Sequence, residues 1–294
     1  MAESTHHAVL AGVDGSASAE HAVTWAAEEA ARLRAPLDLV HACAVVPVHS
    51  RIALPRSFHE ALADQGREWL DRAADLAKEA ALGVAVCTRL RAGFAVETLL
   101  AEAESARLLV LGTRGLGGFT GLLVGSTAVA LAAHGSCPVV VVRGDNVPPA
   151  EGPVVVGVDG SPAGEGAIRF AFDAASRRGA PLVALHTWSD VTVRDMWTAA
   201  MPELDWEVLE TKERELLAER LAGWQEKYPD VEVRRVVTTS RPARSLIEES
   251  RRAGVVVVGS RGRGGVRGML LGSTSQALLH HSHCPVAVVP SRIS

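Results

Sequence analysis

GTRGLGGFTGLLVGST, residues 112–127, returns further along the chain as GSRGRGGVRGMLLGST, residues 259–274, with ten of the sixteen positions identical. Other stretches recur in the same order. VLAGVDGS (9–16) reappears as VVVGVDGS (154–161), and SCPVVVV (136–142) has its counterpart in HCPVAVV (283–289). This order of repeats indicates a tandem duplication in which each half of the 294 residues is one folding unit.

The repeat also predicts the domain boundaries. The stretch RGDNVPPAEGP ends the first copy and is rich in proline and charge, which is typical of a linker. We therefore predict domains at 1–144 and 154–294, joined by a linker at 145–153. The offset between the copies grows from 145 residues (Pro36 to Pro181) to 147 (Cys137 to Cys284), so the second copy gained two residues between its second and third strands.

Apolar runs rich in valine and leucine alternate with stretches of helical periodicity in both copies. The expected strands are 8–13, 37–45, 84–90, 108–112 and 138–142, then 154–158, 182–187, 231–238, 255–259 and 285–289. The expected helices are 18–34, 60–82, 94–106 and 125–135, then 164–179, 203–228, 243–253 and 272–282. Apolar strands alternating with helices indicate an α/β fold of two tandem doubly wound domains, each a five-stranded parallel sheet flanked by helices.

Composition narrows the classes of function. Lys and Arg number 30 against 34 Asp and Glu, which gives a net charge of −4 and disfavours nucleic-acid or anionic-membrane binding. The beginning of the sequence has no apolar signal segment, so we expect a cytoplasmic location. The charge-free window 121–142 is interrupted by turn residues and predicts a loop, helix and buried strand rather than a membrane span. The four cysteines form no CxxC pair and are expected to be reduced and buried.

The repeated glycine-rich stretch has the features of an anion-binding loop. It follows a strand and ends at a helix start, where unpaired N–H groups and the helix dipole attract phosphate. It is not a P-loop, because GxxxxGK[ST] requires a lysine and the only lysines are Lys78, Lys212 and Lys227. It also lacks the GxGxxG spacing of a dinucleotide fingerprint and follows the fourth strand rather than the first.

The spacing resembles that of a known family. Both copies match G-x2-G-x9-G-[ST], the motif of ATP-binding universal stress proteins, through Gly112, Gly115 and Gly125-Ser126 and again through Gly259, Gly262 and Gly272-Ser273. The chain is similar to a tandem member of that family over nearly all of its length. The resemblance implies an adenine-nucleotide alpha-hydrolase-like fold and ATP, together with Mg²⁺, as the ligand of each domain.

The resemblance also implies roles for particular residues. Asp14 and Asp159, at the ends of the first strands, would lie against the nucleoside, with Gly12 and Gly157 just before them. Ala42 and Thr187 would give backbone contacts to adenine. Ribose and phosphates would be held by Gly112, Arg114, Gly115, Gly125, Ser126, Thr127, Gly259, Arg261, Gly262, Gly272, Ser273 and Thr274. The phosphates would carry the Mg²⁺, and no protein metal site is expected.

Several alternatives remain open on the residues alone. Asp14 and Asp159 could simply cap the helix that follows them, and Arg114 and Arg261 could be solvated loop charges. HHSHC at 280–284 looks like a metal cluster, but part of it belongs to the repeated end of a helix. The extra Arg263 and Arg267 of the second loop predict stronger phosphate attraction there.

For the whole chain, we expect a nucleotide-dependent regulator of the stress response with no catalytic residues and at most weak ATP hydrolysis. An ATP-using transferase or hydrolase on the same fold and a scaffold with empty sites are the alternatives. A homodimer is expected, along with an internal pseudo-dimer in which the fifth strands of the two domains pair. The sequence does not identify a regulatory protein partner.

Overall fold

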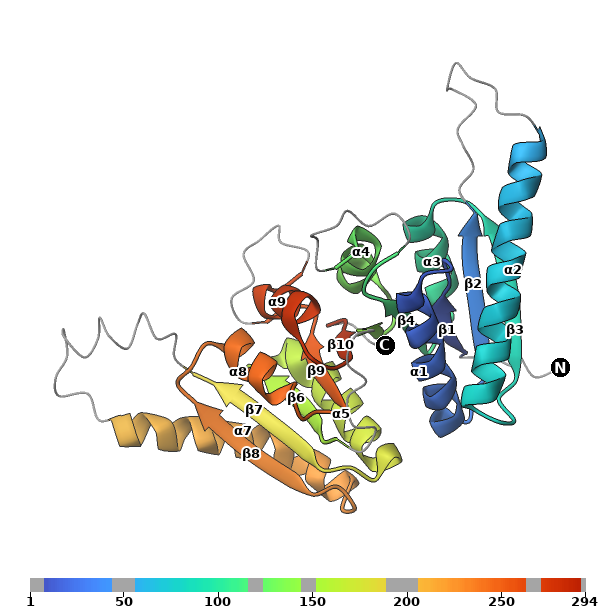
Figure 1. Cartoon of the computed structure of the whole chain (residues 1–294). Helices are drawn as coiled ribbons and strands as arrows, with labels where there is room; N and C mark the ends of the chain where they lie inside the picture. Colours follow the sequence, from blue (N-terminus) through green and yellow to red (C-terminus); the bar gives the residue numbers. More distant parts are fainter. Residues whose placement is uncertain are drawn as a thin grey trace. The chain divides into compact units, whose positions relative to one another are not determined.

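The structure is a computed structural model that describes residues 8–43, 56–115, 124–143, 152–188, 206–262 and 271–291. The chain divides into two compact units, Met1–Asp145 and Asn146–Ser294. Each unit has a parallel sheet with helices packed against it, which confirms the predicted α/β fold (Figure 1).

The first unit alternates strands and helices along its whole described length. Its strands pair in parallel in the order β3-β2-β1-β4-β5. Its elements are β1 (Val9–Gly12), α1 (Ala17–Leu33), β2 (Leu37–Cys43), α2 (Arg56–Ala80), β3 (Val86–Ala92), α3 (Ala95–Ala103), β4 (Leu108–Gly112), α4 (Ser126–His134) and β5 (Val139–Val142).

The second unit repeats this arrangement with the strand order β8-β7-β6-β9-β10, again all parallel. A short 3-10 turn, η1 (Pro162–Gly164), is added before its first α-helix. The other elements are β6 (Val154–Val158), α5 (Glu165–Arg178), β7 (Leu182–Thr187), α7 (Trp206–Lys227), β8 (Val233–Thr238), α8 (Pro242–Glu249), β9 (Val255–Gly259), α9 (Ser273–His281) and β10 (Val286–Val289).

The chain winding reverses beside the first strand of each sheet. In the first unit the connections from β1 to β3 run in one direction, and the connection from β3 crosses back to β4 on the other side of β1. Right-handed crossovers then place α1 and α2 on one face and α3 and α4 on the other, and each of these helix pairs is in contact. The connections that leave the carboxyl ends of β1 and β4 run in opposite directions, and a crevice for ligands is expected between them.

The third strand of the first sheet differs from the prediction. β3 extends to Ala92 and its side chains are half-buried or exposed, whereas the sequence predicted an apolar strand ending at residue 90. Arg89 and Arg91 lie within the strand and form ion pairs with side chains of other elements. Because they are charged, a search for apolar runs does not assign them to a strand. α2 begins at Arg56, four residues before its predicted start.

The charge-free window 121–142 contains α4 and the fully buried strand β5 in its described part. Every helix in the described residues is too short or too polar to cross a bilayer.

All four cysteines are free, but they are not all buried as predicted, since Cys87 is exposed. Burial raises the pKa of Cys137 to about 11 and that of Cys284 to about 12, so both stay protonated thiols.

The two units fill the same internal position differently. In the second unit Phe172 of α5 is fully buried and its ring stacks on those of Trp224 and Tyr228 from the end of α7, with centroid separations of 6.2 and 5.8 Å. The repeat offsets place alanines at all three equivalent positions, and each is buried: Ala27 of α1, Ala77 of α2 and Ala81 just after α2. Small residues let helices approach closely, so the larger rings of the second unit fill a space that the first unit does not have.

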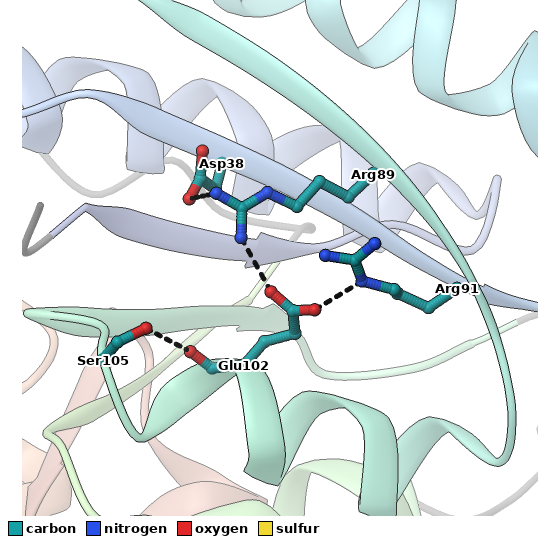
Figure 2. A network of polar contacts seen from close by, with 5 residues as sticks. All are labelled: Asp38, Arg89, Arg91, Glu102 and Ser105. Atoms are coloured by element: carbon teal, nitrogen blue, oxygen red, sulfur yellow. Dashed lines mark hydrogen bonds and ion pairs between the residues drawn. The ribbon is translucent and has the colours of Figure 1, made fainter.

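A charged network joins three elements of the first unit (Figure 2). Arg89 of β3 lies between Asp38 of β2, at 2.7 Å, and Glu102 of α3, at 2.8 Å. Arg91 donates a second hydrogen bond to Glu102 at 2.5 Å, and Ser105 contacts its backbone oxygen. Burial alone would raise the pKa of Glu102, but the hydrogen bonds from Arg91 and Arg89 outweigh it and lower this pKa below its ordinary value.

We predict that Glu102 makes the first unit sensitive to acid. Because its pKa is lower in the folded chain than the ordinary 4.5, its stabilisation is complete above that pH and is lost as the pH falls through the lowered value. Glu102→Gln should cost about 1–3 kcal/mol at pH 7 and much less at pH 3. Urea unfolding at the two pH values measures this, with the exposed Glu104→Gln as the control. An equal cost at both pH values would contradict the prediction.

Candidate functional site

The turn that follows β1 is shaped by an aspartate and a serine. Asp14 Oδ1 accepts hydrogen bonds from the backbone N of Ser16 at 3.1 Å and from its hydroxyl at 2.7 Å. The same hydroxyl oxygen accepts from Ala19 N at 3.2 Å, so Ser16 is the N-cap of α1. The helix cap is therefore Ser16 and not Asp14. Gly15 between them has φ +80°, a conformation that favours glycine.

The glycine loop begins directly over this turn. Gly112 lies so close to α1 that a Cβ there would be 2.6 Å from the backbone and hydroxyl of Ser18, and a Cβ on Gly115 would overlap Oδ2 of Asp14. The oxygen of the Ser16 hydroxyl, whose proton goes to Asp14 at the shorter distance, is also 3.0 Å from the carbonyl oxygen of Arg114. The strand-one aspartate and the start of the loop, 100 residues apart in the chain, are thus in contact.

The far end of the loop returns to its beginning. Gly125 N donates to the carbonyl oxygen of Thr113 at 2.6 Å, and α4 starts at the next residue. Gly125 is the N-cap, and it provides no side-chain hydrogen bond to the first turn of the helix. The first N–H groups of α4, together with the exposed Ser126 and half-buried Thr127, therefore form a donor-rich surface with the positive end of a helix dipole.

The second unit reproduces this geometry. Ser161 donates to Asp159 from its backbone N at 2.9 Å and from its hydroxyl at 2.8 Å. A Cβ on Gly262 would lie 2.8 Å from Oδ2 of Asp159. Gly272 N donates to Ser260 O at 2.8 Å and is the N-cap of α9, again without a side-chain cap. Ser273 is exposed and Thr274 half-buried, as in the first copy, and Gly259 ends β9 as Gly112 ends β4.

The neighbouring strand is tied to this turn by a histidine in each unit. Nδ1 of His41 is 2.7 Å from the carbonyl oxygen of Val13, and Nδ1 of His186 is 2.7 Å from that of Val158. The residues after these histidines are Ala42 and Thr187, both half-buried. They lie at the carboxyl ends of β2 and β7, next to the aspartate turns but on the adjacent strand.

Gly12 and Gly157 have a packing role in the structure. A Cβ on Gly12 would be 2.7 Å from a methyl of Leu111 and 3.3 Å from one of Leu99. A Cβ on Gly157 would be 3.0 Å from a methyl of Leu246. These glycines let the first strand lie tightly under the α3 or α8 side of the sheet, and this packing by itself accounts for glycine at both positions.

Arg114 and Arg261 are exposed and directly precede the glycines that contact the aspartates. Their side chains would add positive charge beside the uncapped helix N-termini. Arg263 and Arg267, on which the prediction of stronger phosphate attraction rests, lie outside the described residues. Within the described part of the chain, no three His, Cys, Asp or Glu residues are grouped as a metal site, including those of HHSHC.

Some residues of the site were not predicted from the sequence. Ser16 and Ser18 organise the contact between turn and loop, and a hydroxyl two residues after the strand-one aspartate was the available signal. Trp69 of α2 was missed altogether. Its ring lies against Gly15 and, edge to face, against His41 with centroids 5.2 Å apart. No local signal connects Trp69 to a turn more than 50 residues earlier in the chain.

Comparison with known proteins identifies the family of the chain. The family model described as "Universal stress protein family" matches residues 5–143 and again 152–290. The chain belongs to the universal stress protein family. A universal stress protein of Mycobacterium tuberculosis strain H37Rv is 43% identical over 289 residues, which cover 96% of each chain. Another from Mycolicibacterium smegmatis is 43% identical over 297 residues, with 98% of each chain covered.

A solved universal stress protein from Archaeoglobus fulgidus has the same tandem fold. It superposes with a TM-score of 0.71 over 98% of this chain and 99% of its own, at 20% sequence identity. At that identity the likeness concerns the fold alone. This universal stress protein therefore has a two-unit architecture that is shared far beyond its mycobacterial relatives.

Proposed function

We propose that each unit binds one adenine nucleotide, ATP with Mg²⁺, and that the bound nucleotide makes the chain a regulator of the stress response. The observation that carries the proposal is the duplicated contact between aspartate and glycine loop beside an uncapped helix N-terminus. Two working sites require the aspartate and the glycines in both units, and both copies have them, whereas a relic site would be free to lose its glycines or its aspartate.

The groups present fit a nucleotide. Phosphates suit the first N–H groups of α4 and α9 with their serine and threonine hydroxyls. The carboxylates of Asp14 and Asp159 suit a hydroxyl-bearing sugar or base, since a carboxylate accepts hydrogen bonds. Bound Mg²⁺ would neutralise phosphate charge, and the phosphate oxygens and water would be its main ligands. Arg114 and Arg261 are the cationic residues next to this position.

The first test is the content of the purified chain. Protein prepared without added nucleotide is denatured, and the released small molecules are identified and quantified per chain. Close to two adenine nucleotides per chain support the proposal, and their phosphate state names the ligand among ATP, ADP, AMP and cyclic nucleotides. No release, followed by no binding of added ATP with Mg²⁺, would favour the scaffold with empty sites.

Added ATP with Mg²⁺ should also raise the melting temperature of nucleotide-free protein. A ligand at 100 times its Kd stabilises the folded state by about 2.7 kcal/mol. For units of this size that corresponds to a shift of roughly 5–11 °C. GTP with Mg²⁺ at the same concentration is the control for adenine preference. An unchanged melting temperature with saturating ATP would contradict nucleotide binding.

Weak hydrolysis at most is part of the proposal, and a phosphate-release assay tests it against the enzyme alternative. Multiple turnovers per minute would favour an ATP-using transferase or hydrolase.

A homodimer is also part of the proposal. It predicts a solution mass of twice the 30.9 kDa of one chain, to be measured by light scattering with and without nucleotide.

A further inference from the structure

The two units differ where their second helix meets the strand-two histidine. In the first unit α2 presents Gly66, and a Cβ there would lie 2.6 Å from Cδ2 and 3.1 Å from Nε2 of His41. The repeat offset of 147 residues places Glu213 of α7 at the equivalent position of the second unit. Its Oε2 is 2.9 Å from Nε2 of His186. A glycine in one copy is therefore an acid in the other, directed at the same ring atom.

The hydrogen bonds of His186 determine where its protons lie. Nδ1 is 2.7 Å from a backbone carbonyl oxygen, which can only accept, so Nδ1 must donate. In a neutral ring Nε2 then carries a lone pair, and an ionised carboxylate offers only lone pairs as well. A hydrogen bond of 2.9 Å between them requires one proton, either on the ring or on Glu213. Among the described residues, the hydrogen-bond partner of His41 is the Val13 carbonyl oxygen at Nδ1, and this contact needs no such proton.

We propose that Glu213 is a positioning residue of the second site. With His186 it holds a proton that the first site lacks, and through the Val158 carbonyl this pair fixes the turn that carries Asp159. The consequence for nucleotide rests on the function proposed above, whereas the proton and its coupling to the turn do not. His186 is 1% exposed and Glu213 is 26% exposed in their side chains, so the pair is largely shielded from water.

Several other charged groups near β7 have partners of their own. Just after β6, Asp159 accepts from Ser161. On β8, Arg235 donates to Gln225, and Arg234 pairs with Glu249 of α8. On α5, Glu165 accepts from the Trp224 ring N–H at 2.5 Å. On α7 itself, one turn before Glu213, Glu210 pairs with Arg214. The pair His186–Glu213 is hydrogen-bonded to the Val158 carbonyl, and through it the protonation of the pair can affect the turn.

Loss of the shared proton would leave two lone pairs facing each other at 2.9 Å. Their repulsion would separate α7 from β7 and loosen the turn at Asp159. Nucleotide affinity at the second site is therefore expected to fall as the pH rises, by up to tenfold per pH unit for one linked proton. The first site, with Gly66 and Trp69 against His41, should show no such fall.

The proton is tested without ligand by NMR of the histidine ring nitrogens in the full chain. We expect His186 to carry protons on both nitrogens, or to share the second with Glu213, and His41 to carry one on Nδ1. In Glu213→Gln the amide can donate to Nε2, so the second ring proton should disappear while the backbone signals of Asp159 and Ser161 keep their positions. Glu213→Gly should move those signals, and the control Glu210→Gln should change neither.

Coupling is tested in the same samples by a pH titration. In the wild type the amide signal of Ser161 should shift together with the ring signals of His186 as the pH is raised, and the shift should vanish in Glu213→Gln. A wild-type His186 with a single ring proton beside an ionised Glu213 carboxylate, or a Ser161 shift that persists in Glu213→Gln, would overturn the proposal. ATP titrations at pH 6 to 9 then compare the two sites. A second-site affinity that falls with pH only when Glu213 is present supports the role in binding, and equal pH profiles for both sites overturn it. Failure of ATP to bind either site rejects the proposed function but leaves the NMR outcome to decide the proton.

Discussion

Gly115→Ala is expected to weaken nucleotide binding at the first site about 10- to 150-fold, and Gly262→Ala to do the same at the second. In each case the new methyl would clash with an aspartate oxygen, Oδ2 of Asp14 or, at 2.8 Å, Oδ2 of Asp159. The aspartate can turn away only by giving up its hydrogen bonds from the serine of the turn. Losing one charged hydrogen-bond partner of the ligand corresponds to about 1.5–3 kcal/mol.

Isothermal titration of each single variant measures this effect, because the unaltered site serves as an internal reference. Gly223→Ala is the matched control: it makes the same chemical change on α7, where a Cβ would meet no heavy atom within 4 Å. There the added methyl should leave binding unchanged and stabilise the helix by about 0.5–1 kcal/mol. Two sites of wild-type affinity in Gly115→Ala and Gly262→Ala would show that the glycine and aspartate contact does not form the binding site.

The largest effect on stability is expected from Phe172→Ala, which should destabilise the second unit by about 3–5 kcal/mol. The ring is fully buried and stacks on Trp224 and Tyr228, so truncation would leave a cavity under two large side chains that cannot collapse without moving α7. The first unit has an alanine at the equivalent position, Ala27, and the residues equivalent to Trp224 and Tyr228 are the alanines Ala77 and Ala81.

Hydrogen exchange, measured residue by residue, reports the stability of each unit separately in this experiment. Protection should fall in α5, β6 and β7, and stay unchanged in α1, β1 and β2. Phe172→Leu fills most of the same space and is expected to cost roughly 1–2 kcal/mol. A uniform loss of protection across both units, or a cost for Phe172→Ala no greater than that for Phe172→Leu, would contradict a local packing role for this ring.

Much of the fold follows from the sequence, because strand and helix periodicity are local properties and the duplication doubles each signal. The strand order and the reversal beside β1 follow from handedness rules once the elements are known. The convergence of Asp14 with Gly115 was also predictable, since both follow strands whose carboxyl ends lie side by side. The end of β3 was not predictable, because its charged arginines are accommodated in the strand by ion pairs with Asp38 and Glu102, which lie on other elements.

Local patterns and the internal repeat were enough to predict a duplicated α/β chain with a glycine loop after the fourth strand of each copy. The contacts that support each loop are visible only in the folded chain. Trp69 against Gly15 and Glu213 against His186 are contacts across long stretches of chain, and they depend on which face of a long helix turns toward a neighbouring strand. A helix of 3.6 residues per turn changes that face with every residue, so its contacts are fixed by packing and not by local sequence.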